Sequence, residues 1–283
     1  MPNKSKLKVA TCQFSTSASA RRNGAQVQRQ MRDAKRKGAQ LVHFPECALS
    51  GYCGSELENW KGYDWGVLRD ETAQIMDLAR KLKVWVVLGS SHPLSGKHLP
   101  HNCLYVINPN GRLIERYDKR FCTDGDLLNY SPGNHFATFS ANGVKCGLAI
   151  CYDVRFPELY RRYRKLGVEL MLDSFYNARA DGRNIHTTIM RPSLQARAAT
   201  NYFWISAPNA SARYQAWPSV FIQPDGTIVQ SLRQNRPGVM VNTVDTGKKL
   251  YDASRPYRVR AMKGILNSGR IPSDPRSRKR NAL

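Results

Sequence analysis

Gly147-Leu-Ala-Ile-Cys-Tyr-Asp-Val-Arg-Phe-Pro-Glu158 joins a predicted core strand to a predicted helix. Residues 144–150 are apolar at almost every second position, while Gly147 and Ala149 are small on the other face. This pattern is typical of a buried strand that has another element packed closely against its small side. Apolar side chains then recur at helical spacing at Phe156, Leu159, Tyr160 and Tyr163.

A cysteine stands where this strand ends and the helix begins. A sharp turn from strand to helix can expose a side chain at the edge of a sheet, and a helix N-terminus favours an anion there. A thiol in such a place, or beside a lysine, has a pKa lowered from about 8.5 toward neutrality. Cys151 is therefore a candidate nucleophile. Its position alone also fits a small buried apolar residue, which is what most free cysteines are.

The composition is that of a globular protein. The chain has 283 residues, of which 41% are hydrophobic, and a chain of this length can form one large domain. Its longest apolar runs, such as residues 84–88, are far shorter than the roughly 20 residues that span a bilayer, so no membrane contact is expected. Seven cysteines without regular spacing, and no visible secretory signal, predict reduced thiols in a cytoplasmic protein.

The net charge is unusually positive. Lysine and arginine number 44 against 21 acidic residues, a formal charge of +23. Such a surface attracts polyanions or steers acidic substrates. The basic residues are spread along the chain and form no tract with interleaved aromatics, so contact with nucleic acid is not predicted to be specific.

Strands and helices alternate along the chain, and three predicted hairpins interrupt the alternation. The hairpins pair residues 102–108 with 112–117, 135–140 with 144–150, and 217–222 with 227–231. Further strands are predicted at 7–14, 39–44, 84–90, 169–173, 202–207 and 239–244, and helices at 21–38, 69–82, from 156 and at 184–200. Pro192 is expected to kink the last helix or to start its second half. Hairpins within an alternating pattern indicate mixed sheets with helices outside, and this many strands favour two sheets packed face to face.

Two more charged residues follow strand ends. Glu46 comes after Val42-His-Phe-Pro, and Lys119 after the hairpin strand that ends Tyr117-Asp118. A carboxyl can take the proton of an attacking thiol and return it to a leaving amine, and a lysine with a backbone N–H can stabilise an oxyanion. Taken singly, Glu46 could equally be a loop or cap carboxylate, and Lys119 a solvated surface charge.

Three segments together resemble the signature of the nitrilase superfamily, the carbon–nitrogen hydrolases. They are Phe44-Pro-Glu46, Tyr117-Asp-Lys119 and Ile150-Cys-Tyr-Asp-Val-Arg-Phe-Pro-Glu158, followed by Gln195-Ala-Arg-Ala-Ala-Thr-Asn201 and the turn Gln223-Pro-Asp-Gly226. Because the resemblance runs from about residue 7 to 245, we expect a carbon–nitrogen hydrolase domain at 1–246. Residues 247–283 form a basic C-terminal extension in which we expect little order.

The resemblance implies a fold and a set of roles. The fold is a four-layer αββα sandwich of two mixed β-sheets with outer helices, commonly paired into a homodimer through helices that include the one after the cysteine. The implied catalytic residues are Cys151 as nucleophile, Glu46 as general base and acid, and Lys119 as oxyanion stabiliser. The backbone N–H of Tyr152 would complete the oxyanion hole.

One position departs from the family pattern. Members often carry a second glutamate about seven residues after the lysine, where this chain has Asp126. Aspartate keeps the charge but is one methylene shorter. The resemblance therefore implies a supporting role for Asp126 beside Lys119, with Asp124 as the alternative.

The residues around the cysteine favour amide chemistry. Cys-Tyr-Asp-x-Arg-Phe resembles the amidase branches, including the omega-amidase-like enzymes, whereas true nitrilases tend to have Trp-Glu after the cysteine. The expected reaction is hydrolysis of a small amide through a thioester, giving a carboxylic acid and ammonia or an amine. It needs no metal and no organic cofactor. Hydrolysis of an N-carbamoyl compound or of a nitrile by the same three residues remains an alternative.

Substrate selection is expected in the loops 47–66 and 174–183. The candidate wall residues are Tyr52, Phe175, Tyr176 and Asn177. A substrate carboxylate could be held by Arg155, Arg179 or Arg183 through a bidentate pair, although arginines usually lie on the surface.

Three other classes of function are compatible with parts of the sequence. A papain-type hydrolase would use His43 or His186 as base, but the local nucleophile signature of that class is missing. A metal site is poorly supported because the cysteines and histidines form no paired C-x-x-C set. A non-catalytic protein that binds polyanions on a hydrolase scaffold is the main alternative, since the charge favours it.

Overall fold

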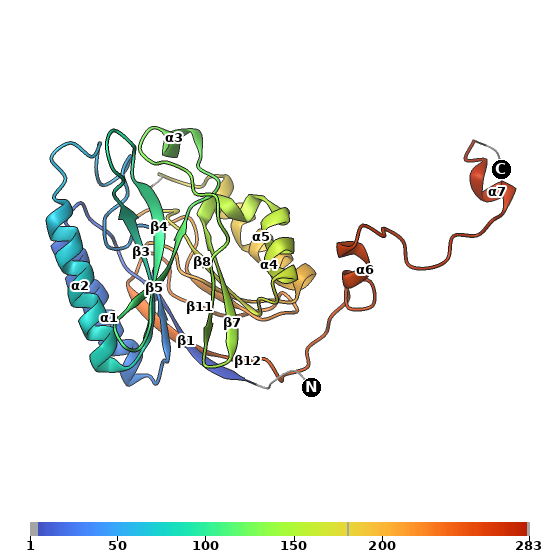
Figure 1. Ribbon diagram of the computed structural model, residues 1–283, viewed down its shortest axis with the longest axis horizontal. Helices are drawn as coiled ribbons and strands as arrows, with labels where there is room; N and C mark the ends of the chain where they lie inside the picture. The colour runs from blue at the N-terminus through green and yellow to red at the C-terminus, as the bar shows by residue number, and fades with distance from the viewer. Residues whose placement is uncertain (1–4, 180, 282–283) are drawn as a thin grey trace.

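The computed structural model is a sandwich of four layers, and it describes residues 5–179 and 181–281. Two six-stranded sheets pack face to face, and helices cover both outer faces (Figure 1). The predicted αββα arrangement of two mixed sheets with outer helices is confirmed.

The first sheet has the strand order β12-β1-β2-β3-β4-β5. Its inner strands β1, β2 and β3 run parallel, while β12, β4 and β5 pair antiparallel with their neighbours. The bounds are β1 Lys6–Gln13, β2 Leu41–His43, β3 Trp85–His92, β4 His101–Ile107, β5 Leu113–Asp118 and β12 Gly238–Asp245.

The second sheet has the order β11-β10-β9-β8-β7-β6. Here β7, β8 and β9 are parallel, and β6 and β10–β11 pair antiparallel at the two sides. All three predicted hairpins are therefore present. The bounds are β6 Thr138–Ala141, β7 Val144–Ile150, β8 Leu170–Ser174, β9 Trp204–Ala207, β10 Val220–Ile222 and β11 Ile228–Ser231.

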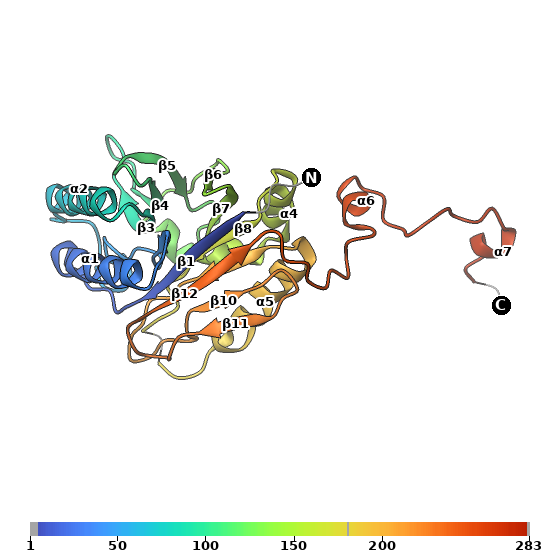
Figure 2. The ribbon, with the colours of Figure 1, turned by 90° about the horizontal axis from the view of Figure 1, so that it is seen from below.

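Two helices cover each outer face (Figure 2). On the first sheet lie α1 (Ala20–Arg36) and α2 (Trp65–Leu82), and on the second α4 (Pro157–Lys165) and α5 (Ile185–Asn201). The helix α2 begins four residues earlier than predicted because the Asp64 side chain accepts a hydrogen bond from the Val67 N–H at 2.9 Å and caps it there. Among the described residues, no helix is both long and apolar enough to cross a membrane.

The helix α5 continues through Pro192 as one element, so this proline does not start a second helix. A proline inside a helix removes one backbone hydrogen bond. Packing offsets that cost, because Met190, Leu194 and Ala198 are buried in the core under the helix.

The core consists of three apolar layers, one under each helix pair and one between the sheets. The layer between the sheets joins Val9 and Val87 of the first sheet to Leu148 and Leu172 of the second. Buried polar contacts also cross this layer. His43 hydrogen-bonds Ser206 at 2.9 Å and Ser174 at 2.8 Å, which ties β2 to β9 and β8. Because β2 leads to Glu46, this tie helps to fix the loop that follows it.

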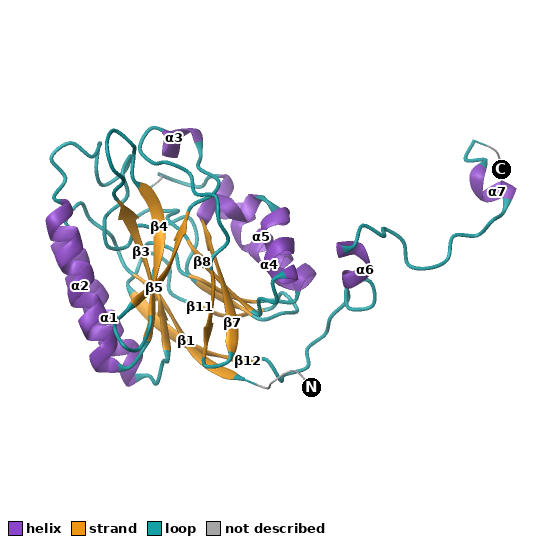
Figure 3. Cartoon of the chain, viewed as in Figure 1, coloured by secondary structure: helices purple, strands orange, loops and turns teal. Residues whose placement is uncertain are grey.

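The C-terminal extension is mostly loop and leads away from the sandwich (Figure 3). It contains two short helices, α6 (Arg258–Met262) and α7 (Pro275–Arg278). Its first part contacts the body: the Leu250 N–H donates to the Tyr202 hydroxyl at 3.0 Å, and the Arg258 Nε donates to the Thr200 carbonyl at 3.0 Å. The buried Arg258 also pairs with Asp252.

We expect Gly147→Ala to destabilise the fold by roughly 1–3 kcal/mol, because overpacking a close contact forces neighbours to move. A Cβ at Gly147 would lie 2.8 Å from a Tyr163 ring carbon and 3.0 Å from the Met171 sulfur. Urea unfolding measures the change. Gly125→Ala is the control, since the added Cβ would lie 3.9 Å from the Thr123 hydroxyl, an ordinary contact. Equal stability of the two variants would contradict the packing argument.

Candidate active site

Three strand ends bring Glu46, Lys119 and Cys151 into one site. Glu46 lies three residues after β2, Lys119 directly follows β5, and Cys151 directly follows β7. The first two side chains are completely withdrawn from solvent, and the Lys119 Nζ lies 2.8 Å from the Glu46 Oε1. An ion pair in such a place requires close geometry to offset the cost of removing both charges from water.

Lys119 has a second buried anion. Its Nζ also lies 2.8 Å from the Asp126 Oδ2, and the Tyr52 hydroxyl donates to the other oxygen of that carboxylate. Asp126 belongs to the one-turn helix α3 (Asp124–Leu127), and its backbone and side chain both bond Thr123 at the helix start. Asp124 is exposed on the same helix. Of the two aspartates considered from the sequence, Asp126 is the one at Lys119.

The two oxygens of Glu46 have different surroundings. Oε1 accepts hydrogen bonds from Lys119 and from the Asn102 Nδ2, the latter at 2.8 Å. Oε2 is buried and has no hydrogen-bond partner among the described residues. A carboxylate oxygen in that state has full capacity to accept a proton or a hydrogen bond from a molecule in the site.

A glycine lets the Glu46 backbone approach the sheet. A Cβ on Gly89 of β3 would lie 1.9 Å from the Pro45 carbonyl oxygen and 2.9 Å from the Cys47 nitrogen. No larger residue fits without moving the loop that carries Glu46. Cys47 itself has a φ of 50°, a left-handed backbone that is strained for a non-glycine residue.

Cys151 begins a tight turn instead of the first turn of an α-helix. Residues Cys151–Arg155 form a 3₁₀ turn, and α4 starts only at Pro157. The φ of Cys151 is 47°, so this turn is strained, as is common where a functional side chain must be held in one position.

Asp153 ties this turn to the strand that carries Lys119. Its carboxylate accepts from the Ile150 N–H at 3.0 Å, the Phe121 N–H at 2.9 Å and the Tyr117 hydroxyl at 2.7 Å. The three donors come from either side of Lys119 and from the residue before Cys151. The fully buried Asp153 therefore fixes the two segments relative to each other.

The surroundings of the cysteine favour the protonated form of its thiol. Burial raises the pKa of the Cys151 thiol well above its usual range, Glu46 raises it further, and Lys119 lowers it. The expected depression by a helix N-terminus is wrong, because the nearest α-helix starts six residues later and burial dominates. Because Glu46, Lys119 and Cys151 shift one another's pKa values, the three groups lie within electrostatic reach of one another.

The other two groups remain an ion pair. Burial alone would lower the pKa of Lys119, but Glu46, Cys151 and Asp126 raise it well above its ordinary value. Burial raises the pKa of Glu46, Lys119 opposes that, and Asp126 adds to it. Although burial opposes it, Lys119 holds the pKa of Asp126 below its ordinary value. The site thus holds an ammonium between two carboxyl groups, of which Glu46 accepts a proton more readily.

A cavity of about 230 Å³ is connected to the cysteine through Asn177, although Glu46, Lys119 and Cys151 are not among its lining residues. Its wall includes three residues predicted from the sequence, Tyr52, Tyr176 and Asn177, and the Asn177 Nδ2 lies 3.5 Å from the Cys151 Sγ. The rest of the wall is Ser55, Ala178, Asn184, His186 and Ala216.

The fourth predicted wall residue, Phe175, and the three arginines considered for a substrate carboxylate do not line this cavity. Phe175 is fully buried and packs edge-on against Trp217 in the core. Arg155 is half-buried and acts electrostatically on His186. Arg179 already pairs with Glu56 at 2.8 Å, and Arg183 is exposed. Arg155 and Arg179 each act electrostatically on one wall residue, Arg155 on His186 and Arg179 on Tyr176.

Residues 8–248 match the family model of the carbon–nitrogen hydrolases. The match covers most of the chain and contains Glu46, Lys119 and Cys151. The chain belongs to the carbon–nitrogen hydrolase family. The family expected from the three sequence segments is therefore confirmed.

Curated relatives of this carbon–nitrogen hydrolase are distant. A Staphylococcus lugdunensis protein named hydrolase in agr operon is 32% identical over 220 residues, covering 74% of this chain and 88% of its own. The omega-amidase of Xenopus tropicalis is 27% identical over 239 residues, covering 79% and 83%. Nitrilase homolog 2 of Dictyostelium discoideum is 27% identical over 221 residues, and the match spans 72% of this chain but 65% of that protein.

Solved structures share the fold. An amidase of the nitrilase superfamily from Nesterenkonia AN1 superposes with a TM-score of 0.78 at 20% identity, covering 94% of this chain and 99% of that one. The same amidase has been solved in complex with butyramide, with a TM-score of 0.74, 22% identity and coverage of 85% and 91%. At these identities the likeness establishes the architecture.

Neither histidine named for a papain-type mechanism makes a hydrogen bond to Cys151 within the described residues. His43 is buried between the sheets, and burial lowers its pKa to about 3, so it is neutral. His186 lines the cavity, and its Nδ1 has no partner within the described residues. Across residues 5–179 and 181–281, no group of three or more potential ligands could hold a metal ion.

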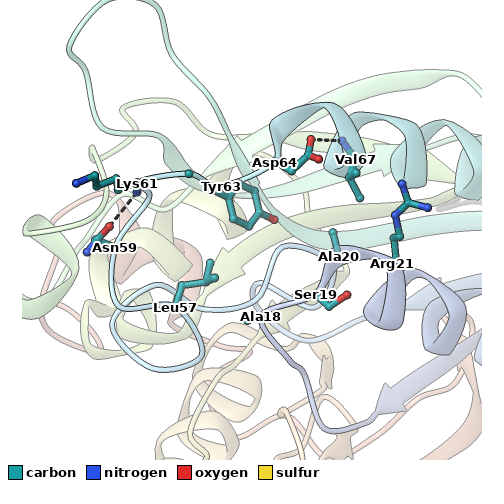
Figure 4. A pocket seen from close by; sticks show the side chains of 11 residues that line it. Ala18, Ser19, Ala20, Arg21, Leu57, Asn59, Lys61, Tyr63, Asp64 and Val67 are labelled. Carbon is teal, nitrogen blue, oxygen red and sulfur yellow. Dashed lines mark hydrogen bonds between the residues drawn. The ribbon is translucent and has the colours of Figure 1, made fainter.

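A second cavity of about 300 Å³ lies apart from these residues, where α1 and α2 begin (Figure 4). Ser19, Arg21, Tyr63 and Asp64 belong to its wall. Neither Glu46, Lys119 nor Cys151 lines it.

Sequence reasoning missed three polar residues that hold the site. Asn102 bonds Glu46, Asp153 ties the cysteine turn to β5, and Trp217 bonds the Asn177 Oδ1 at 2.9 Å. Asp153 stands within the quoted signature and could have been considered. The other two are remote in sequence and carry no local signal.

Replacing Lys119 by methionine should lower the free energy of unfolding by roughly 3–5 kcal/mol at pH 8, because two buried carboxylates lose their cation. Without the ammonium, the pKa values of Glu46 and Asp126 both rise, so the native variant takes up protons as the pH falls. The deficit should therefore shrink between pH 8 and pH 5. Urea unfolding at both values checks this, with the exposed Lys97→Met as control; a deficit that grows toward pH 5 would refute the sign.

Proposed function

We propose that the protein hydrolyses the amide bond of a small non-peptide substrate through a thioester on Cys151, giving a carboxylic acid and ammonia or an amine. One observation carries the proposal. A thiol shares a desolvated site with an ammonium held between two carboxyl groups, and the Glu46 Oε2 has no partner there. Membership of the carbon–nitrogen hydrolase family supports it.

In the first half of the reaction, the Glu46 Oε2 takes the thiol proton while the sulfur attacks the carbonyl carbon. The carbonyl electron pair moves to oxygen, and Lys119 with the backbone N–H of Tyr152 stabilises the resulting oxyanion. When the oxyanion collapses, the carbon–nitrogen bond breaks. Glu46 gives its proton to the leaving nitrogen, so that ammonia or an amine departs and a thioester remains.

In the second half, water replaces the amine. Glu46 takes a proton from water, and the hydroxide attacks the thioester carbon. The carbon–sulfur bond breaks as the acid forms, and the sulfur recovers a proton from Glu46. The resting thiol and carboxylate are restored, so no metal or organic cofactor is called for.

The positions of the other residues suggest supporting roles. Asp126, held by Tyr52, keeps Lys119 charged and aimed between the two carboxyl groups. Tyr52, Tyr176 and Asn177 would contact the acyl part of the substrate, since they line the cavity. Arg155 would add attraction for a substrate carboxylate, and Phe175 would act only through packing.

The relatives support the amide over other bonds. Two are named as an omega-amidase and an amidase, and the latter was solved with butyramide. In another structure of that amidase, the acetamide moiety of fluoroacetamide is covalently added at the active-site cysteine. N-carbamoyl compounds and nitriles are the second choice, because the same three residues would serve them.

Assembly and location complete the proposal. We expect two copies to pair through surfaces that include α4, the helix after the cysteine turn, in a cytoplasmic homodimer with its seven thiols reduced. Light scattering of the purified chain tests the pairing.

Ammonia release from a panel of simple amides, omega-amides, N-carbamoyl compounds and nitriles tests the function. Wild type should release ammonia from at least one amide, and Cys151→Ala and Lys119→Met should be inactive while folded, each losing at least about a thousandfold. If no panel member is hydrolysed while polyanion affinity falls steeply with salt, the protein is instead a polyanion-binding member of the family.

Glu46→Gln should accumulate the acyl-enzyme. Glutamine fills the same space but cannot take a proton from water, so a thioester that forms is hydrolysed slowly. Intact mass after a brief substrate pulse should show the protein plus one acyl group, lost on hydroxylamine treatment. The double variant Glu46→Gln with Cys151→Ala is the control, and an adduct on it would place the acyl group elsewhere.

In Asp126→Asn, the acid limb of the pH profile of kcat/KM should shift to lower pH. Activity requires ionised Glu46, so it rises with pH through the Glu46 pKa, which burial and Asp126 both raise. Asparagine removes the negative charge, so that pKa falls and half-maximal activity occurs at lower pH. Asp124→Asn, on the exposed side of α3, should leave the acid limb at the wild-type pH. A shift of the limb to higher pH in Asp126→Asn would contradict the assignment of Asp126 as the residue that raises the Glu46 pKa.

A further inference from the structure

The Asn177 side chain contacts the Cys151 sulfur directly. Its Nδ2 lies 3.5 Å from the sulfur and 3.3 Å from the Tyr176 carbonyl oxygen. The two N–H groups of one amide nitrogen can supply both bonds. Asn177 therefore presents a hydrogen-bond donor to the reactive atom, in addition to lining the cavity.

The orientation of this amide is determined by its neighbour. The Trp217 indole N–H donates to the Asn177 Oδ1 at 2.9 Å. An indole nitrogen can only donate, so the amide oxygen must face Trp217 and the amide nitrogen must face the sulfur. A flipped amide would set two donors against each other and leave the sulfur facing an oxygen.

The backbone around Asn177 is held as well. Its N–H donates to the Asn209 Oδ1 at 2.7 Å, and its carbonyl accepts from the Ala216 N–H at 2.9 Å. The Asn209 Nδ2 also donates to the Trp217 carbonyl at 2.7 Å. Both Trp217 and Asn209 are buried, so the amide is positioned by the fold before any substrate binds.

A neutral donor is useful at this sulfur. As the thiol loses its proton, negative charge develops in a desolvated place next to the Glu46 carboxyl. Lys119 directs two of its three N–H bonds to Glu46 and Asp126, so it is shared between anions. A hydrogen bond from an uncharged amide stabilises the sulfur anion without drawing Lys119 from its partners.

We propose that Asn177 is a catalytic residue that donates a hydrogen bond to the Cys151 sulfur as it becomes a thiolate, and that Trp217 is the positioning residue that orients the amide. This deepens the proposed function and rests on its assignment of Cys151 as nucleophile. It does not depend on the identity of the amide substrate.

The rate at which iodoacetamide modifies Cys151, followed by peptide mass between pH 6 and pH 10, tests the donor. Asn177→Leu, which keeps the volume, should react about tenfold more slowly than wild type at pH 7 and remain slower across this range, because its thiolate is less stable. Asn177→Asp, which places an acceptor at the sulfur, should be slower still. The modification rate of Trp217→Phe should lie between those of wild type and Asn177→Leu, because the Asn177 amide can then flip.

Trp85→Phe is the matched control for the tryptophan change, since Trp85 packs on Phe139 between the sheets and should leave the rate unaltered. Circular dichroism checks that each variant is folded. If Asn177→Leu is unfolded, the rates of Asn177→Asp and Trp217→Phe test the proposal instead. Wild-type rates in these variants would overturn the proposal.

Failure of the proposed function would look different. Cys122, the other partly exposed thiol, is the internal reference in every sample. If wild-type Cys151 reacted no faster than Cys122, the nucleophile assignment itself would fall. A fast wild type with equally fast variants would remove only the role of Asn177.

Discussion

The buried pairing of Lys119 with Glu46 and Asp126 is the constraint on which the rest of the site depends. Removing three charged groups from water costs several kcal/mol for each ion, and only short contacts in fixed geometry offset that cost. The two 2.8 Å contacts to the Lys119 Nζ meet this condition. Once formed, the pairing leaves the Glu46 Oε2 without a hydrogen-bond partner among the described residues. Burial raises the pKa of the neighbouring thiol, Glu46 adds to that shift and Lys119 opposes it.

Such geometry needs a rigid frame, and the two sheets supply it. The Lys119 and Cys151 segments belong to different sheets, and Asp153 joins them by accepting hydrogen bonds from both. His43 does the same on the other side, where its two ring nitrogens connect β2 to β8 and β9. Thr11 of β1 also hydrogen-bonds Ser206 at 2.7 Å, and the Gln13 Oε1 accepts from the Ser219 hydroxyl at 2.7 Å. Together these polar contacts help to fix how the sheets register at the end where the site lies, and they allow a strained residue such as Cys151 to persist.

Much of the fold could be predicted from periodicity, and the errors have physical causes. The strand at 144–150 and its small face were correct, since the Tyr163 ring packs against Gly147. The start of α2 was placed too late because the cap of Asp64 is a side-chain interaction that hydrophobic spacing does not report. The helix predicted from Phe156 begins at Pro157, but the 3₁₀ turn Cys151–Arg155 before it was not predicted, because the local pattern could not show that Asp153 turns back to bond Ile150.

The sequence by itself determined the family, the layered architecture and the order of the three chemically capable residues, because hydrophobic periods and short motifs are local properties. The tertiary structure alone decided which aspartate meets Lys119, that the Cys151 thiol has a raised pKa, and that Asn102, Asn177 and Trp217 share the site. These features depend on burial and on contacts between distant segments, such as Lys119 with Glu46, which are 73 residues apart in the chain. Desolvation and hydrogen-bond geometry are properties of the assembled interior, and no stretch of sequence contains them.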